Sequence, residues 1–240
     1  DDVLAAQHLR RAVFAEDGDA PASSEGRQTL MYGLSGGGPI EQYFDDRSDH
    51  VLVWHQPTDG RPQLVATARL LPPHANDASP RSAGLVADQY FGLRPLERLL
   101  NSTVEVSRLC VHPEHRGGAA VALLLGGIAR YQHLTGYRYL LGQVPIDLGD
   151  GGHSAAAVWD LALSSNVAPA ERRCRPRDPI AIGGLPRSPY PAVPPMLHAC
   201  LRLGAKVCGP PGYNQLAHTA DFLVLLDVHE RDRGRLPGFD

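Results

Sequence analysis

One stretch of the chain, residues 104–118, combines the residue types that proton transfer and anion binding require. It begins with an alternating, β-branched strand pattern that carries one carboxylate, Glu105, and one guanidinium, Arg108. A turn containing proline follows, and Gly117 and Gly118 come directly before an apolar helical pattern. A strand, a glycine turn and a helix start in this order form an anion site, because the first N–H groups of a helix have no acceptor within it.

A carboxylate beside an anion site is suited to acyl transfer from a thioester to an amine. Glu105, directly or through a water molecule, would remove a proton from the amine so that its lone pair can attack the thioester carbonyl. Backbone N–H groups around Leu109–Val111 would meet the developing oxyanion. Gly117–Ala119 would hold the pantetheine arm of the donor or its phosphate. This reaction requires neither a covalent enzyme intermediate nor a metal ion.

The same residues also have ordinary structural interpretations. A strand glutamate usually faces solvent, and Arg108 could simply pair with a surface carboxylate. Two glycines before a helix often form a plain turn. Strict alternation places Glu105 and Arg108 on opposite faces of the strand, so a shared site requires a β-bulge near Ser107.

Other chemistries are less well supported by the sequence. His112 and His115 have no third cluster of ligands to complete a metal site, so we predict none. Cys110 lacks an orienting histidine and acid, which favours a small buried hydrophobe over a nucleophile. The glycines at 36–38 are not followed by the Lys-Ser/Thr of a nucleotide loop, which predicts a flexible loop.

Hydrophobic periodicity predicts the elements that position the candidate site. Helical patterns cover residues 5–13, 93–100, 118–134, 155–163 and 196–203. Strand patterns cover residues 51–54, 64–71, 104–111, 137–141 and 222–226. Residues 17–48 are predicted to form a long loop, and residues 168–195, rich in proline and arginine, an insertion. The alternation of strands and helices favours one α/β domain with a mixed sheet.

Composition limits the classes of function. The chain has 240 residues, of which 43% are hydrophobic and 20% charged, as in a soluble globular protein. A net charge of −3 provides no overall basic field for nucleic acid. No apolar run approaches the roughly 20 residues that span a bilayer, and no signal-peptide pattern is present, so we expect a cytoplasmic location. The irregular spacing of the four cysteines fits neither a zinc site nor a disulfide framework.

Further motifs occur in a fixed order over nearly the whole chain. They are Arg10-x-x-x-Phe14, Asp46-x-x-Asp49-His50, Arg69 within Ala66–Leu71, Glu105-x-x-Arg108, Val111-His112-Pro113, Arg116-Gly117-Gly118 and a C-terminal block from Leu201 to Phe222. In this order the motifs resemble those of acyltransferases of the GNAT (N-acetyltransferase) fold that use acyl-carrier-protein thioesters. These enzymes are the acyl-homoserine-lactone synthases and, with greater similarity, the ornithine-lipid (hemolysin-like) N-acyltransferases.

The resemblance implies a fold and an activity. We expect a single GNAT-like α/β domain over residues 1–240, with helices flanking a mixed, mostly antiparallel sheet that is splayed at the strand Val104–Val111. The expected activity is bacterial aminolipid synthesis, in which a long, optionally 3-hydroxylated acyl group moves from acyl carrier protein to the α-amine of an amino acid. Ornithine is the preferred acceptor. No cofactor is expected besides the phosphopantetheine-linked donor, for which acyl-CoA could substitute.

The resemblance also assigns roles to individual residues. The catalytic residues are Glu105 and Arg108. The residues that contact the donor are Leu109, Val111, Arg116, Gly117, Gly118 and Ala119. Supporting or substrate-contacting residues are Arg10, Phe14, Asp46, Asp49, Arg69 and Ser107. In this group, Asp46 and Asp49 form an acidic pair that anchors the first helix through Arg10 or Arg69.

Two departures from the family pattern affect the choice of substrate. The acetyl-CoA loop is met only in part, since counting from His115 places Gly118 and Ala120 correctly but begins with histidine. A looser loop fits phosphopantetheine, which lacks the nucleotide of coenzyme A. The tryptophan of the lactone synthases has no counterpart in residues 15–50, which disfavours that activity. The alternatives are a lactone synthase, an N-acyl amino acid synthase with another acceptor, and a non-catalytic acyl-binding domain.

An acidic carrier protein needs a positive docking patch even on an acidic enzyme. The densest candidate is the set Arg172, Arg173, Arg175 and Arg177, with Arg187 nearby, although charges in a proline-rich loop are usually just solvated. The alternatives are Arg130 and Arg138, which flank the end of the helix after the glycine turn. A lipid product is also compatible with peripheral membrane contact, but no basic amphipathic helix supports it.

Overall fold

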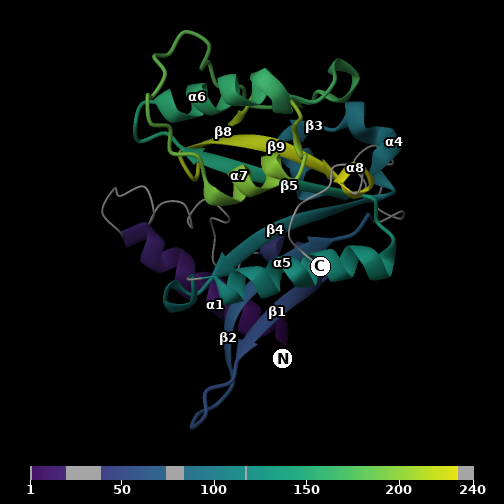
Figure 1. The fold of residues 1–240 in the computed structure, drawn as a ribbon, viewed down its shortest axis with the longest axis vertical. Coiled ribbons are helices and arrows are strands. Elements are labelled where there is room, and N and C mark those ends of the chain that lie inside the picture. The colour runs from purple at the N-terminus through teal and green to yellow at the C-terminus, as the bar shows by residue number, and fades with distance from the viewer. Residues whose placement is uncertain (1, 20–38, 74–83, 117, 232–240) are drawn as a thin grey trace. The chain divides into compact units, whose positions relative to one another are not determined.

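A computed structural model describes residues 2–19, 39–73, 84–116 and 118–231 (Figure 1). The chain divides into two compact units, which are described separately. The first comprises Asp1–Pro72 and Glu105–Gly136, and the second comprises Pro73–Val104 and Tyr137–Asp240. All the residues predicted to form the candidate site belong to the first unit.

The described residues of the first unit form three strands and three α-helices. Its elements are α1 (Asp2–Asp19), α3 (Pro39–Asp45), β1 (Asp49–His55), β2 (Gln63–Leu71), β4 (Thr103–Val111), the 3-10 turn η3 (Pro113–His115) and α5 (Ala119–Thr135). β2 is the central strand, with β1 and β4 antiparallel on its two sides. β4 begins in the second unit and continues into the first.

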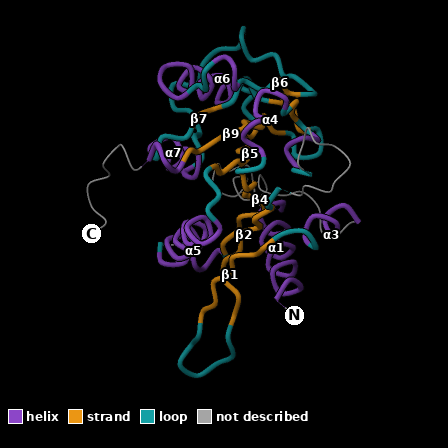
Figure 2. The backbone as a smooth tube through the Cα atoms, turned by 90° about the vertical axis from the view of Figure 1, so that its right-hand side faces the viewer, coloured by secondary structure: helices purple, strands orange, loops and turns teal. Residues whose placement is uncertain are grey.

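Helices α1 and α5 cover opposite sides of β1 and β2 (Figure 2). Because both faces of the sheet are covered, β2 is buried at every position from Leu64 to Leu71. On one face, α1 contributes Ala6, Leu9 and Val13, whose spacing of three and four residues aligns them along the helix. They pack with Leu64 and Cys110 in a buried core. Cys110 is therefore a buried core residue, as predicted.

Two adjacent glycines of α5 provide a matched test of how closely this helix packs on β1. A Cβ at Gly127 would lie 2.6 Å from a methyl carbon of Val51, whereas a Cβ at Gly126 would meet nothing within 4 Å. We expect Gly126→Ala to raise the free energy of unfolding by about 0.5–1 kcal/mol, because alanine loses less backbone entropy in a helix. Gly127→Ala should instead lower it by about 1–2 kcal/mol, since it displaces a stiff β-branched side chain. Urea denaturation measures both changes, and equal stabilisation by the two would contradict the close packing.

The second unit is organised around β9 (Thr219–Asp227), which is buried at all nine positions. β9 pairs antiparallel with β5 (Tyr139–Asp147), β7 (Lys206–Val207) and β8 (Gly212–Asn214). A separate ladder joins β3 (Phe91–Gly92) to β6 (Arg175–Pro176). The α-helices among its described residues are α4 (Glu97–Leu100), α6 (His153–Leu161), α7 (Pro195–Arg202) and α8 (Val228–Arg231). The α/β class and the mostly antiparallel strands agree with the sequence prediction.

Most predicted elements are confirmed, with differences at their ends. The predicted helix over 93–100 is a 3-10 turn, η2 (Arg94–Leu96), followed by the single turn of α4, and the strand predicted at 137–141 extends to Asp147. The predicted loop over 17–48 is wrong at both ends, because α1 continues to Asp19 and α3 occupies Pro39–Asp45. Its middle, including the glycines at 36–38, lies outside the described residues.

The segment 168–195 is partly ordered by contacts within the second unit. It contains the turn η5 (Ala170–Arg172) and strand β6, and Cys174 and Ile182 are buried in it. That it is an insertion within one domain of residues 1–240 stays a prediction. In the described part of the chain, no helix has the length and apolar character needed to cross a membrane.

Candidate functional site

Strand β4 carries a β-bulge where the candidate catalytic residues lie. Between the paired positions Ser107–Arg69 and Cys110–Thr67, β4 has two residues where β2 has one. The first of the two is Arg108, whose φ of 54° lies in the left-handed region that few non-glycine residues adopt. An extra residue of this kind interrupts the ladder and re-aims the side chains around it. The bulge predicted near Ser107 is therefore confirmed, one residue further along the strand.

Glu105 is almost completely buried, with 1% of its surface exposed. It pairs with Leu71 of β2, two positions along from the pair formed by Arg69 and Ser107. Because side chains alternate along a strand, Glu105 lies on the same face of the sheet as Arg69 and Ser107. The ordinary interpretation of a solvent-facing strand glutamate is thereby excluded. A carboxylate in such a position stays charged only with polar partners around it.

A second buried carboxylate, Asp45 at the end of α3, connects α1 to β2. Its side chain has no exposed surface and accepts hydrogen bonds from Arg10 Nη1 at 2.8 and 3.1 Å and from Arg69 Nη1 at 3.2 Å. Gln7 Nε2 donates to the same carboxylate at 2.9 Å. Arg69 Nε in turn donates to Ser107 Oγ of β4 at 3.0 Å. Side-chain contacts thus join α1, α3, β2 and β4 on the face that carries the buried glutamate.

The charges of this network determine the protonation of its members. Burial by itself raises the pKa of Asp45, but the Arg10 and Arg69 guanidiniums and the hydrogen bonds from Gln7 and Arg10 outweigh it, so the pKa lies below its usual value of 3.8. His50 Nδ1 lies 3.0 Å from Arg10 Nη2. Burial, and then the charge of Arg10, lower the pKa of His50. At pH 7 Asp45 is therefore an anion between two cations, next to a neutral imidazole.

The acidic pair predicted to anchor the first helix, Asp46 and Asp49, does not have this role. Asp46 is exposed and accepts a hydrogen bond from Gln42 Nε2 at 2.6 Å. Asp49 is exposed as well and accepts one from the Tyr131 hydroxyl of α5 at 2.7 Å. The anchoring carboxylate is Asp45, directly before the predicted pair.

Sequence reasoning misses Asp45 because it treats residues 17–48 as a loop. Within the short helix α3, Phe44 and Asp45 are both buried. The one signal in the sequence is that Asp45 directly follows an apolar aromatic residue, whereas Asp46 is flanked by Asp45 and Arg47. This signal becomes informative only when the segment is known to be helical.

Of the predicted donor-binding residues, Leu109 and Val111 lie in β4, and the others lie at the turn between β4 and α5. Gly118 is the N-cap of α5 and has a φ of 119°, a conformation that residues with a side chain rarely adopt. Gly118 and Ala119 are exposed, so an anion can approach the first N–H groups of the helix. Arg116 Nε donates to the carbonyl oxygen of Val111 at 3.4 Å, which ties the turn to the end of β4. Gly117 lies outside the described residues.

The remaining predicted site residues have less defined surroundings. Phe14 lies in α1, but its side chain is outside the described part of the structure. Leu109 is half-buried in the bulge.

The ring of His115 lies 5.9 Å from that of His112 and 5.0 Å from that of His55. Among the described residues, no group of three or more His, Cys, Asp or Glu side chains could hold a metal ion.

The sequence profile of an acetyltransferase (GNAT) domain matches residues 9–126, which run from the middle of α1 through β1, β2 and β4 to the first half of α5. The chain also aligns with curated relatives over most of its length. It is 28% identical to the L-ornithine N(alpha)-acyltransferase of Rhodobacter capsulatus, over 95% of this chain and 86% of the relative. It is also 28% identical to the L-ornithine N(alpha)-acyltransferase of Rhizobium meliloti, over 95% of this chain and 77% of the relative.

Among solved structures, the fold is similar to that of FeeM, an N-acyl amino acid synthase from uncultured soil microbes. The TM-score is 0.50 and the sequence identity 12%, over 97% of this chain and 94% of FeeM. At this identity the similarity supports the fold and not the substrate. The α/β architecture with a GNAT domain agrees with the prediction from the sequence.

Proposed function

We propose that this protein, an acyltransferase with the GNAT fold, transfers a long fatty acyl group from acyl carrier protein to the α-amine of ornithine. The observation that carries the proposal is that Glu105 is a buried carboxylate on the bulged strand that runs into the glycine turn before α5. Relatedness over 95% of the chain to proteins named L-ornithine N(alpha)-acyltransferase supports the choice of acceptor.

Glu105 is the general base of the proposed reaction. At neutral pH the α-amine of an amino acid is mostly protonated and cannot attack a carbonyl. Glu105, directly or through one water molecule, takes its proton, and the amine nitrogen attacks the thioester carbon. The nitrogen of the tetrahedral adduct then releases its second proton to solvent and an amide C–N bond replaces the C–S bond, while the proton held by Glu105 passes to the departing thiolate. No covalent intermediate forms on the protein.

The bulge and the helix start have complementary roles in this proposal. A bulge turns backbone N–H groups out of the regular ladder, and those from Leu109 to Val111 stabilise the oxyanion of the tetrahedral intermediate. Arg108, which lies in the bulge, is proposed as the second catalytic residue because it brings a positive charge to this point of the strand. The donor's phosphate binds the N–H groups of Gly118 and Ala119 with the help of Arg116. Leu109, Val111 and Gly117 complete the donor contacts.

A mass-spectrometric assay tests the proposal. Purified protein is incubated with 3-hydroxyacyl and unsubstituted acyl carrier protein thioesters and an equimolar mixture of amino acids. We expect N-acyl-ornithine as the main product, and a lower kcat/KM when acyl-CoA with the same chain replaces the carrier donor, because the glycine turn departs from the coenzyme A pattern. If another amino acid is acylated instead of ornithine, that amino acid is the acceptor and the proposed substrate is wrong. Release of methylthioadenosine from S-adenosylmethionine would indicate a lactone synthase, and no product from any donor would contradict the proposal.

A further inference from the structure

The arginines of the second unit differ in whether they have a carboxylate partner. Three form ion pairs: Arg138 with Asp227 at 2.6 Å, Arg177 with Asp88 at 3.0 Å and Arg187 with Asp160 at 2.6 Å. Five others come from segments that pack together and, in the described part of the chain, form no ion pair. We call these five the arginine surface: Arg94, Arg98, Arg172, Arg173 and Arg175.

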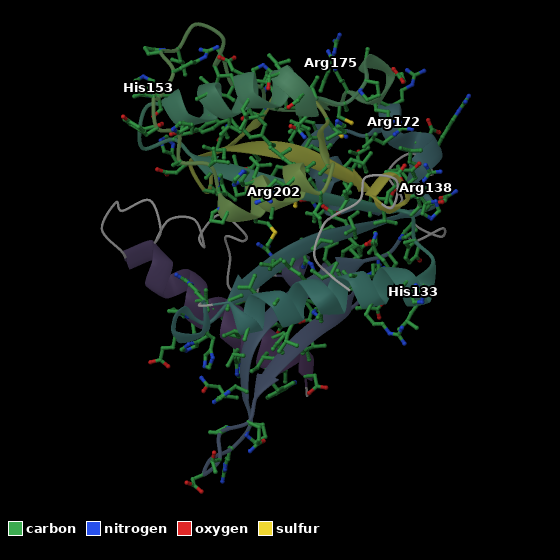
Figure 3. All side chains as sticks on the ribbon, in the orientation of Figure 1. His133, Arg138, His153, Arg172, Arg175 and Arg202 are labelled. Carbon is green, nitrogen blue, oxygen red and sulfur yellow. The ribbon has the colours of Figure 1, made fainter. Side chains whose placement is uncertain are left out.

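Two segments far apart in sequence build the arginine surface. Arg94 and Arg98 belong to η2 and α4, and the other three belong to η5 and β6 or lie between them. The segments meet because η2 packs on η5. In addition, β3 pairs with β6. This pairing puts Arg175 opposite Gly92, which lies two residues before the start of η2. Figure 3 shows Arg172 and Arg175 at the outer surface of this unit.

The arginine surface is positive on a protein whose net charge is −3. Four of its five arginines are exposed, and Arg172 is half-buried. The carboxylates nearest in sequence, Glu97 and Glu171, are exposed and form no ion pair with it among the described residues. Among the described residues, Arg173 is the only one of the five whose side chain forms a hydrogen bond, from Nε to the carbonyl oxygen of Ala168 at 2.8 Å. Like charges held together repel, and a partner of opposite charge relieves this repulsion.

The structure changes the docking patch predicted from the sequence. Arg177 and Arg187 were expected to belong to it, but each is neutralised by an aspartate. Arg138, predicted as an alternative, is neutralised in the same way. Arg94 and Arg98, which lie about 80 residues earlier than the predicted patch, are added by tertiary packing.

We propose that the arginine surface docks the acidic carrier protein that brings the acyl thioester, an inference that rests on the proposed function. Arginine is enriched at protein–protein interfaces, where its planar group binds carboxylates. Binding to a membrane surface combines basic residues with exposed apolar anchors. None of the large exposed hydrophobic side chains of the described chain falls within residues 86–100 or 168–178. An acidic protein therefore fits this surface better than a lipid headgroup layer.

The experiment compares two double variants of the full-length protein. Arg98→Glu with Arg175→Glu reverses two exposed arginines of the surface whose side chains form no hydrogen bond with the described residues. The matched control, Arg61→Glu with Arg202→Glu, reverses two exposed arginines that form no ion pair within the described chain. Arg61 lies in the β1–β2 connection and Arg202, labelled in Figure 3, at the end of α7. Initial rates are measured with the acyl carrier protein donor and with the same acyl group on free pantetheine, over a series of salt concentrations.

We expect the surface variant to raise the KM for the carrier donor about tenfold or more and to flatten its dependence on salt. Its rate with acyl-pantetheine, and both rates of the control variant, should equal those of the wild type. An unchanged KM for the carrier donor, or an equal loss with both donors, would overturn the docking proposal. If the charge-reversed protein does not fold, the double variant Arg98→Gln with Arg175→Gln replaces it. Because glutamine removes the positive charge without adding a negative one, we expect about half the change in log KM.

Two further measurements separate this proposal from others. If the wild type acylates nothing, the proposed function fails, and fluorescence anisotropy of labelled holo-carrier protein still measures docking to the wild type and to the surface variant. Sedimentation with vesicles containing anionic phospholipid measures membrane binding. Vesicle binding that is lost in the surface variant while the carrier KM stays unchanged would assign the surface to lipid and reject the proposal.

Discussion

Replacing Glu105 with glutamine is expected to lower kcat at pH 7 about a hundredfold or more, with little change in stability. Glutamine keeps the shape and one acceptor oxygen of the buried side chain but cannot accept a proton from the attacking amine. As the pH rises toward 9, a larger fraction of the acceptor amine is already unprotonated, so the rate of the variant should recover in part. Steady-state kinetics from pH 6 to 9 measure both effects.

Glu114→Gln is the matched control, because Glu114 is an exposed glutamate in η3, nine residues further along the same segment. We expect it to retain wild-type kinetics. Glu105 could instead serve only to support Arg69, which shares its face of the sheet. In that case Glu105→Gln would unfold at lower urea concentration and its activity would not recover at high pH. Wild-type turnover in the variant would show that another group is the base.

Asp45→Asn is expected to lower the free energy of unfolding by about 3–5 kcal/mol, because it leaves two buried guanidiniums without their shared anion. Arg10 and Arg69 both donate to this carboxylate, whose side chain has no exposed surface. Asp46→Asn is the control, since Asp46 is exposed, and it should change stability by no more than about 0.5 kcal/mol. Urea denaturation at pH 7 measures both. Equal effects of the two substitutions would mean that the buried ion pairs contribute no more than a surface contact.

The stabilisation by Asp45 should also depend on pH in a defined direction. The pKa of this carboxyl is lower in the folded protein than its usual 3.8, so the folded state favours the ionised form. The contribution is therefore complete above pH 3.8 and is lost as the pH falls through the lower folded pKa. The difference in stability between wild type and Asp45→Asn should accordingly be constant from pH 5 to 7 and shrink below pH 4. A difference that grows on acidification would contradict the assignment.

Local patterns were sufficient to predict the elements that carry the candidate site. α5 is recognisable because its apolar residues repeat with the period of a helix, and β2, β4 and β9 because short runs rich in apolar and β-branched residues are typical of strands. The bulge in β4 was predicted as a condition for bringing Glu105 and Arg108 together, and the pairing with β2 contains it. Short elements such as α3 and η2 have too few residues to display a period, which explains why the first was predicted as loop.

The sequence by itself determined which residues are available for chemistry: one carboxylate on an apolar strand, and a glycine turn at the start of a helix. Only the tertiary structure decided how the charged residues are paired. Of the three aspartates between positions 45 and 49, it buries Asp45 against two arginines and leaves the other two exposed. The tertiary structure also pairs Arg177 with Asp88, and it packs η2, which carries Arg94, against η5, which carries Arg172. Ion pairing is decided by distances of a few ångströms between segments far apart in the chain, and no local pattern records such distances.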